Sequence, residues 1–278
     1  MRKVSAQDII KTVRELCIRA AYELEPDVAG ALRAARDTEA SDLGKEVLDQ
    51  IIRNFEIASS ESVPMCQDTG IAVFFIEVGR EVELASSLEE AVNEGVRQGY
   101  EEGRLRKSVC HPFKRTNTGD NTPAIIHTTI TEGDRIRIKI APKGGGSENM
   151  SGLRMLKPSE GREGVKSFVL DTVITGGGNP CPPIVVGVGV GGNFELSAIL
   201  AKKALLRPVG ESNPDPEVAT IEASLLKTIN DTGIGPMGFG GTTPALGVHM
   251  EIHPCHIASL PVAVNIQCHA GRHKEAVI

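Results

Sequence analysis

The stretch Val63-Pro-Met-Cys-Gln-Asp-Thr-Gly-Ile-Ala-Val-Phe-Phe-Ile-Glu-Val78 is where the sequence changes from a helical pattern to a strand pattern. Its first half gathers Pro, Asp and Gly, which predicts a turn. Its second half, from Ile71, is a run of apolar residues that predicts a β-strand. Before it, apolar residues recur at helical spacing and predict three helices, which start after Ser5, near Asp27 and after Ser41.

After this stretch the sequence predicts a further helix and a β-hairpin. Ser87 and Glu90 form a capping-box pattern at the start of the helix, which is predicted to end near Gly103. The runs Ala124–Thr131 and Arg135–Ala141 flank a Glu-Gly-Asp turn, which predicts that they pair as a hairpin. Because the second run alternates Arg-Ile-Arg-Ile-Lys-Ile, one face of this hairpin is predicted to meet water.

Beyond residue 141, short apolar segments alternate with glycine-rich loops. The loops are predicted at 144–146, 176–178, 187–192 and 238–241. Helices are predicted over 195–206 and 216–230, and strands over 245–252 and 261–267. We interpret the chain as an α+β protein, with a helical N-terminal portion (1–60) packed on a mixed or antiparallel sheet region (61–278). Residues 1–278 are expected to form a single domain.

The composition is that of a soluble globular protein. Of the 278 residues, 40% are hydrophobic and 24% are charged, and the net charge is -6. This balance gives no reason to expect nucleic acid or a membrane surface as a partner. The N-terminus lacks an apolar signal core, and no run reaches the ~18 apolar residues of a membrane span. We therefore expect a cytoplasmic protein, in which cysteines stay reduced and serve in metal binding or catalysis.

Three of the six cysteines are predicted to lie in turn-rich loops: Cys66, Cys181 and Cys268. Cys17, in contrast, belongs to the apolar stripe of the first helix and is expected to be buried. The wide spacing of the three differs from the close pairs of zinc ribbons and ferredoxins. Two hypotheses remain open. The thiols are buried and inert, or three thiolates hold a cubane cluster that leaves one iron free to act as a Lewis acid.

A group of histidines near the C-terminus raises the alternative of a zinc site. His249, His253 and His256 lie close in sequence, together with Cys255. The segment around residues 249–253 reads as a strand, however, and strand residues four apart are separated by ~13 Å. We therefore favour a hydrogen-bonding role for His256 and structural roles for most of the others.

A glycine pattern raises a second alternative, a dinucleotide-binding oxidoreductase. Residues 187–192 match G-x-G-x-x-G, follow an apolar run and precede a predicted helix. A dinucleotide-binding unit needs a second strand after that helix. A segment with three prolines, residues 207–216, follows instead. These glycines are therefore expected to serve tight packing next to the Cys181 loop.

Five motifs in order give a specific family resemblance. They are Met65-Cys-Gln-Asp-Thr-Gly70, Asn117-Thr-Gly-Asp-Asn-Thr-Pro123, Ala141-Pro-Lys-Gly-Gly-Gly-Ser-Glu-Asn149, Gly178-Asn-Pro-Cys-Pro-Pro183 and Gln267-Cys-His-Ala-Gly-Arg272. Together they resemble class I fumarate hydratases and the related L-tartrate dehydratases. The resemblance runs from about residue 40 to residue 273 and so covers most of the chain.

The resemblance implies a cofactor, a set of site residues and a partner. The implied cofactor is a [4Fe–4S] cluster on Cys66, Cys181 and Cys268. The implied substrate-site residues are Gln67, Asp68, Arg106, Gly144, Gly145 and His256. Single-chain family members continue into a second domain that carries further catalytic and carboxylate-binding groups. This chain resembles the α subunit of a two-subunit version, and those groups are expected on a separate β subunit.

The chemistry of the expected reaction agrees with these residues. Reversible hydration of fumarate to L-malate, a step of the tricarboxylic acid cycle, needs a polarised oxygen, a proton carrier and cations for two carboxylates. The open iron is expected to bind the hydroxyl or water, and Asp68 to handle its proton. Arg106 can grip a carboxylate in bidentate fashion. L-Tartrate is the alternative substrate, and a non-catalytic cluster-bearing subunit is an alternative of another class.

Overall fold

The computed structural model describes all residues 1–278, which divide into two compact units. Unit 1 consists of Met1–Glu25, Asn54–Gly144 and Arg272–Ile278, and unit 2 of Pro26–Arg53 and Gly145–Gly271. Both units draw on the first sixty residues. That residues 1–278 act as one cluster-binding domain stays a prediction. None of the helices combines the length and the apolar character needed to cross a membrane.

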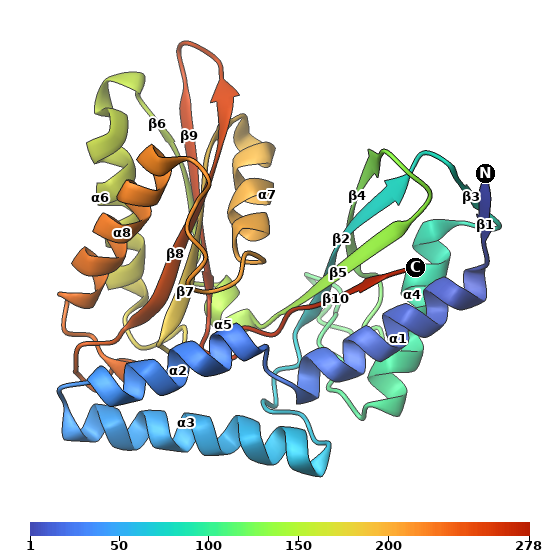
Figure 1. Cartoon of the computed structure of the whole chain (residues 1–278), viewed down its shortest axis with the longest axis horizontal. Coiled ribbons are helices and arrows are strands. Elements are labelled where there is room, and N and C mark those ends of the chain that lie inside the picture. Colours follow the sequence, from blue (N-terminus) through green and yellow to red (C-terminus); the bar gives the residue numbers. More distant parts are fainter. The chain divides into compact units, whose positions relative to one another are not determined.

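Unit 1 is a four-stranded mixed sheet covered by two helices on one face (Figure 1). The strand order is β10 (Lys274–Val277), β5 (Ile136–Lys143), β2 (Ile71–Gly79) and β4 (Ile125–Thr131). The helices are α1 (Ala6–Tyr22) and α4 (Leu88–Glu102), and a small parallel pair joins β1 (Arg2–Val4) to β3 (Val82–Leu84). Fully buried isoleucines of β5, at positions 136, 138 and 140, face the helices, as their alternation with charged residues predicts.

The predicted hairpin of β4 and β5 is wrong. Both strands exist close to their predicted bounds, but β2 lies between them and pairs with each. β4 is parallel to β2, with Val73 opposite Ile125, and β5 is antiparallel to it, with Val73 opposite Ala141. The apolar β2 has no charged residue before Glu77 and takes the central place, where both of its edges are paired and Ala72, Phe74, Ile76 and Val78 are buried against the helices.

Unit 2 has a second four-stranded mixed sheet with helices on both faces (Figure 1). The strand order is β6 (Gly152–Leu156), β9 (Leu260–Gln267), β7 (Ile184–Gly192) and β8 (Ala245–Cys255). Helix α7 (Phe194–Ala204) covers one face, while α6 (Gly161–Gly176) and α8 (Pro216–Asn230) supply apolar side chains to the core on the other. A short helix, α5 (Gly145–Glu148), precedes β6.

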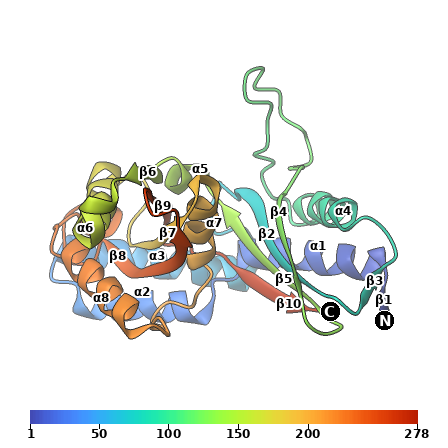
Figure 2. The ribbon, with the colours of Figure 1, turned by 90° about the horizontal axis from the view of Figure 1, so that it is seen from above.

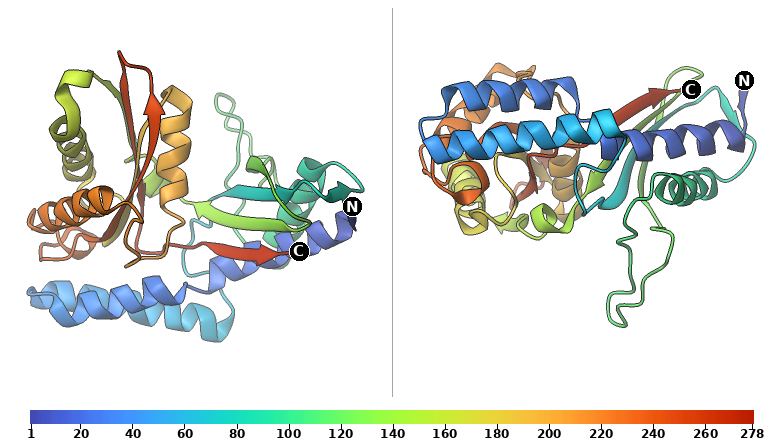
Figure 3. Two further views of the ribbon diagram at one scale, coloured as in Figure 1. Left: turned by 45° about the horizontal axis from the view of Figure 1, so that its top comes forward. Right: turned by 90° about the horizontal axis from the view of Figure 1, so that it is seen from below.

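Helices α2 (Pro26–Thr38) and α3 (Asp42–Glu61) run side by side (Figures 1 and 3). An ion pair between Arg36 and Asp49, 2.9 Å apart, links them within unit 2. The buried carboxylate of Glu39, in the turn between the helices, accepts hydrogen bonds from the backbone N–H groups of Ser41 and Thr242. The turn is thereby fixed to the 238–242 loop of the same unit.

The predicted elements around α1, α2, α3, α4, α7 and α8 are confirmed, as is the α+β fold class. The sequence did not predict α6 or β6, and it placed residues 187–192 in a loop, whereas they belong to β7 and form its C-terminal part. Gly187 and Gly189 lie inside this strand and face α7. A Cβ atom at either position would overlap a carbonyl oxygen of α7, from Ala201 or Ser197. These glycines thus allow close helix packing, which the sequence did predict, although against α7 and not against the Cys181 loop.

The replacement Gly189→Ala is expected to destabilise the protein by about 1–3 kcal/mol, because the strand and α7 must separate to admit a methyl group. Gly30→Ala is the matched control, since Gly30 lies in α2 with no atom within 4 Å of the added Cβ. That change should stabilise the protein by about 0.5–1 kcal/mol. Urea unfolding measures both, and equal effects of the two substitutions would contradict the packing argument.

Candidate functional site

In unit 1, the predicted site residues Cys66, Gln67 and Asp68 share a loop between α3 and β2. Cys66 and Gln67 are exposed and Asp68 is half-buried. The loop is held just before Cys66, because the Met65 N–H donates to the Ala21 carbonyl at 3.0 Å. The Met65 carbonyl in turn accepts from the Asn54 side chain at 2.8 Å. An accessible thiol therefore stands on a fixed backbone.

The end of this loop is fixed by a buried hydrogen-bond network around the Gly70 carbonyl. That oxygen accepts one hydrogen bond from the Tyr100 hydroxyl, at 3.0 Å, and another from the Asn121 side-chain amide, at 3.2 Å. Both side chains are fully buried. Burial raises the pKa of the Tyr100 phenol well above its usual value, so the group stays neutral and donates. No sequence pattern marked Tyr100 or Asn121 as a site residue, although Asn121 belongs to a quoted motif.

Hydrogen bonds of Thr69 and Asn121 hold the segment around Arg106 beside the Asp68 loop. The Thr69 hydroxyl donates to the Arg106 carbonyl at 2.8 Å. Asn121 accepts from the backbone N–H groups of Ser108, at 2.6 Å, and Val109. The Arg106 side chain is exposed and makes no ion pair. Two predicted site residues that lie almost forty positions apart are thus neighbours.

The two carboxylate oxygens of Asp68 have different surroundings. Oδ1 accepts from the Gly70 N–H at 3.0 Å, which confirms the turn-forming role of this residue. Oδ2 lies against Gly144, where a Cβ atom would be 3.0 Å from it and 3.8 Å from Nη2 of Arg272. A side chain at the predicted residue Gly144 would therefore crowd this carboxylate oxygen.

Arg272 is a candidate residue that sequence reasoning missed. Its side chain is only 3% exposed, and Nε and Nη1 are buried with no hydrogen-bond acceptor. Nearly all buried guanidinium N–H groups have partners, so two without one indicate a place for an anionic or polar ligand. The only sequence signal was its position at the end of a quoted motif.

In unit 2, the fold brings Cys181 and Cys268 to the same end of the sheet. Cys181 precedes β7, and Cys268 follows β9 directly. These strands are antiparallel neighbours, with Val185 opposite Gln267. His269 joins the two loops, because its backbone N–H donates to the Cys181 carbonyl at 3.2 Å and its Nδ1 lies 3.0 Å from the same oxygen.

The Cys181 loop of unit 2 is held by its local structure. Cys181 adopts φ +58°, which is rare for a residue with a side chain, and prolines stand on both sides of it. The Pro182 carbonyl accepts from the Met237 N–H at 2.9 Å. The predicted residue Gly145 is exposed and begins α5, and the next glycine lies near this loop, where a Cβ would be 3.7 Å from the Asn179 carbonyl. Both thiols are half-buried, so a ligand can reach them.

His256 lies at the other end of the unit 2 sheet. It is exposed in the turn between β8 and β9, where its Nδ1 accepts from the Ala258 N–H at 3.1 Å. The whole of β9 separates it from Cys268, a distance of roughly 25 Å at the usual rise per strand residue. One chain therefore does not bring His256 to the cysteine loops of unit 2, and its role in substrate binding stays a prediction.

His249, Cys17 and Cys255 have defined local surroundings in the fold. The predicted strand through His249 and His253 is confirmed as β8. His249 is buried with Nδ1 3.2 Å from the Ala204 carbonyl, whereas His253 is exposed. Cys17 is buried in α1, as predicted, and burial raises the pKa of its thiol. The Cys255 thiol donates to the Ser259 carbonyl at 3.2 Å.

Comparisons with known proteins agree with one another. The family model described as "Fumarate hydratase (Fumerase)" matches residues 10–277. "Putative L(+)-tartrate dehydratase subunit alpha" of Methanocaldococcus jannaschii is 48% identical over 271 residues, which cover 95% of each protein. "L(+)-tartrate dehydratase subunit alpha" of Escherichia coli K12 is 36% identical over 250 residues, or 88% of this chain and 82% of that protein. The family match includes every loop described above.

His249 should make stability depend on pH. Burial, aided by the positive charge of Arg207, lowers the pKa of His249 from 6.5 to about 4. Below pH 6.5 the unfolded chain takes up a proton that the folded chain refuses until about pH 4, so the free energy of unfolding should fall by roughly 3 kcal/mol over this window. Urea titrations at several pH values should show a smaller fall in His249→Gln and an unchanged one in His253→Gln. Equal pH profiles in all three proteins would contradict this assignment.

Proposed function

Since the chain belongs to the class I fumarate hydratase family, we propose that it is the α subunit of an iron–sulfur hydro-lyase that dehydrates L-tartrate and needs a β subunit. The expected main substrate, fumarate, is less well supported than the alternative. The relatives with 36% and 48% identity carry the name of L(+)-tartrate dehydratase subunit alpha. Loss of water from L-tartrate gives the enol of oxaloacetate, which is the same class of reaction as loss of water from malate.

We propose that Cys66, Cys181 and Cys268 hold a [4Fe–4S] cluster. The observation that carries this proposal is the meeting of the Cys181 and Cys268 loops at one end of the unit 2 sheet. Their accessible thiols, and that of Cys66 on its pinned loop, fit a cluster better than the buried Cys17 does. When bound, a cluster with three protein ligands supplies a Lewis acid for a substrate hydroxyl.

Asp68 is proposed to carry the proton. In dehydration its carboxyl group gives a proton to the leaving hydroxyl, and in hydration its carboxylate takes one from water. The hydrogen bond from the Gly70 N–H holds Oδ1, and Oδ2 lies beside Gly144. The buried hydrogen bonds from Tyr100 and Asn121 to the Gly70 carbonyl hold the loop in place. A fixed carboxylate needs little reorganisation to reach the geometry of proton transfer.

The carboxylates of the substrate need cations, and this chain offers two arginines near Asp68. Arg106 has an unpaired guanidinium joined to the Asp68 loop through Thr69. Arg272 has two buried N–H groups that a carboxylate oxygen would satisfy. Gln67 and the backbone of Gly144 and Gly145 are proposed to complete the contacts from this side. The remaining cations are proposed to come from the β subunit, in agreement with the names of the relatives.

Cysteine substitutions test the proposed cluster. Cys66→Ser, Cys181→Ser and Cys268→Ser should each lower the iron and sulfide content of anaerobically prepared protein to near zero and remove its visible absorption. Cys17→Ala is the control and should keep the cluster, because that thiol is buried inside α1. Exposure to air should also abolish activity, since an iron with no protein ligand is easily lost. Full cluster content in any of the three Ser variants would remove that cysteine from the ligand set.

Activity assays of the chain mixed with its β subunit test the substrate and the role of Asp68. L-Tartrate should be dehydrated faster than fumarate is hydrated, and neither reaction should occur with the α subunit alone. Asp68→Asn should lower kcat by about 10²–10⁴-fold. Its side-chain oxygen can still accept from Gly70, so the fold and the iron content should be unchanged. A chain that binds the cluster but supports neither reaction would point to the non-catalytic alternative.

A further inference from the structure

The segment between α4 and β4 leaves unit 1 as a long excursion and then returns to it (Figure 2). Arg106 lies near the start of this segment, and the quoted motif Asn117–Pro123 lies at its end. The outgoing and returning parts meet, because Cys110 and Asn117 form a β-bridge. The arginine proposed to bind a substrate carboxylate is therefore on the outgoing part, and the returning part beside it carries a motif that has so far explained little of the site.

Polar side chains of the motif bind the backbone that directly follows Arg106. The Asn117 side-chain N–H group donates to the Lys107 carbonyl at 2.9 Å. The Asn121 side-chain oxygen accepts from the N–H groups of the next two residues along the chain, at 2.6 and 3.3 Å. Because the Asn121 side chain is fully buried, water does not compete for these hydrogen bonds. The motif thus fixes the path of the main chain on one side of Arg106.

The main chain is also fixed on the other side of Arg106. The preceding residue, Leu105, is 2% exposed and belongs to the core of unit 1. The Arg106 carbonyl itself accepts from the Thr69 hydroxyl at 2.8 Å. The Arg106 side chain, in contrast, is exposed. A substrate that binds this guanidinium therefore has to order the side chain alone, which keeps the entropy cost of binding low.

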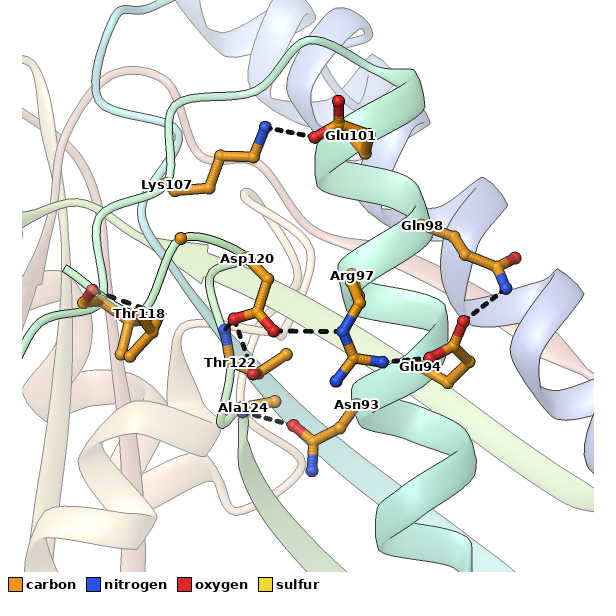
Figure 4. A network of polar contacts seen from close by, with 12 residues as sticks. Asn93, Glu94, Arg97, Gln98, Glu101, Lys107, Thr118, Asp120, Thr122 and Ala124 are labelled. Atoms are coloured by element: carbon orange, nitrogen blue, oxygen red, sulfur yellow. Dashed lines mark hydrogen bonds and ion pairs between the residues drawn. The ribbon is translucent and has the colours of Figure 1, made fainter.

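Asp120 anchors the motif to helix α4 (Figure 4). Its Oδ2 accepts from Nε of Arg97 at 3.1 Å. Its Oδ1 accepts from both the N–H and the hydroxyl of Thr122, at 3.0 and 2.8 Å. One turn earlier on α4, the Asn93 side chain accepts from the Ala124 N–H at 2.8 Å. The returning part of the segment is thereby attached to a helix that packs on the sheet of unit 1.

A second contact between this segment and α4 is weaker. Lys107 donates to Glu101 at 2.7 Å (Figure 4). The Glu101 side chain is 77% exposed, so water and salt screen this pair. The Asp120 side chain is only 27% exposed and accepts from two neighbours at once. Asp120 is therefore the main anchor of the segment on α4.

We propose that Asp120 is a positioning residue that sets where the Arg106 guanidinium meets a carboxylate of the substrate. Arg97 fixes Asp120, and the two asparagines of the same motif then fix the backbone after Arg106. This role rests on the carboxylate binding proposed above for Arg106. Neither Asp120 nor Arg97 has to touch the substrate for it.

The same arrangement predicts which kinetic constant Asp120 affects. The Asp68 loop keeps its own support, because the Tyr100 hydroxyl donates to the carbonyls of Thr69 and Gly70, at 3.1 and 3.0 Å. Loss of the Asp120 anchor should therefore move Arg106 and leave the proton carrier in place. Such a change weakens binding of substrate and transition state alike, which raises KM and leaves kcat nearly unchanged.

Variants of Asp120 test this role in the anaerobic complex with the β subunit. Asp120→Ala removes every hydrogen bond of the carboxylate and should raise KM for L-tartrate about tenfold, with kcat changed by less than about twofold. Asp120→Asn can keep its contact with Thr122 but loses the charge, so KM should rise only about two- to fivefold. Glu132→Gln is the matched control, because it removes an ion pair with Nε of Arg80, 2.8 Å apart, elsewhere in unit 1. KM, iron content and melting temperature should stay at wild-type values in this control.

A double-mutant cycle with Arg106→Met separates positioning from general damage. Arg106→Met alone should raise KM by at least about tenfold, because a charge-assisted contact with the substrate is lost. In the Arg106→Met background, Asp120→Ala should change KM by less than about twofold, since no guanidinium is left to position. Iron content should be the same in all four proteins of the cycle.

Three outcomes would overturn the positioning role. One is an unchanged KM in both Asp120 variants. Another is additive effects of Asp120→Ala and Arg106→Met on KM, which would mean that Asp120 acts on something other than Arg106. The third is loss of iron in both Asp120 variants, which would indicate damage to the fold. In each case the hydro-lyase function stands as long as Arg106→Met raises KM. If Arg106→Met leaves KM unchanged, the carboxylate binding proposed for Arg106 is wrong, and the role of Asp120 is wrong with it.

Discussion

The Gly70 carbonyl is the point on which the local structure of unit 1 depends. It accepts hydrogen bonds from Tyr100 of α4 and from Asn121, which lies near the end of the segment between α4 and β4. Asn121 also accepts a hydrogen bond from the Ser108 N–H, near the start of the same segment. A single buried amide therefore joins three parts of the chain. Without these partners a buried carbonyl would cost about 1–3 kcal/mol. The position of Asp68, two residues earlier, follows from this arrangement.

Much of the fold could be predicted where the signals are local. The capping box at Ser5 and the Asp215-Pro216 start of α8 fix helix ends through neighbouring residues alone. Strand partners could not be predicted, because pairing joins residues far apart in sequence. The Glu-Gly-Asp turn after β4 therefore indicated a hairpin, although β2 takes the central place between the two strands.

Other errors have a different cause. Helix α6 contains the run Val169-Leu-Asp-Thr-Val-Ile-Thr175, whose β-branched residues favour strands, but its packing against β9 and α8 outweighs that preference. In β7 the opposite occurred, since glycines that usually mark loops lie inside a strand to admit α7. In both cases tertiary packing decides between structures that local preference leaves open.

The candidate site shows the same limits. The family resemblance implied Cys66, Asp68, Arg106 and His256 as one group, but a resemblance contains no distances. The length of β9 separates His256 from Cys268 within unit 2, and the role of His256 in substrate binding stays a prediction. Arg272 was missed because its unsatisfied N–H groups can be recognised only in the folded structure, where every buried hydrogen-bond partner is known.

Each unit is assembled from pieces that the chain supplies at different times. The C-terminal strand β10 pairs with β5, more than a hundred residues earlier, and β5 pairs with β2. During synthesis, unit 1 can add this edge strand only after all of unit 2 has left the ribosome. Early on, β5 therefore has one unsatisfied side, and an open strand edge of this kind favours aggregation. Expression at low temperature, which slows association of nascent chains, should suit this topology.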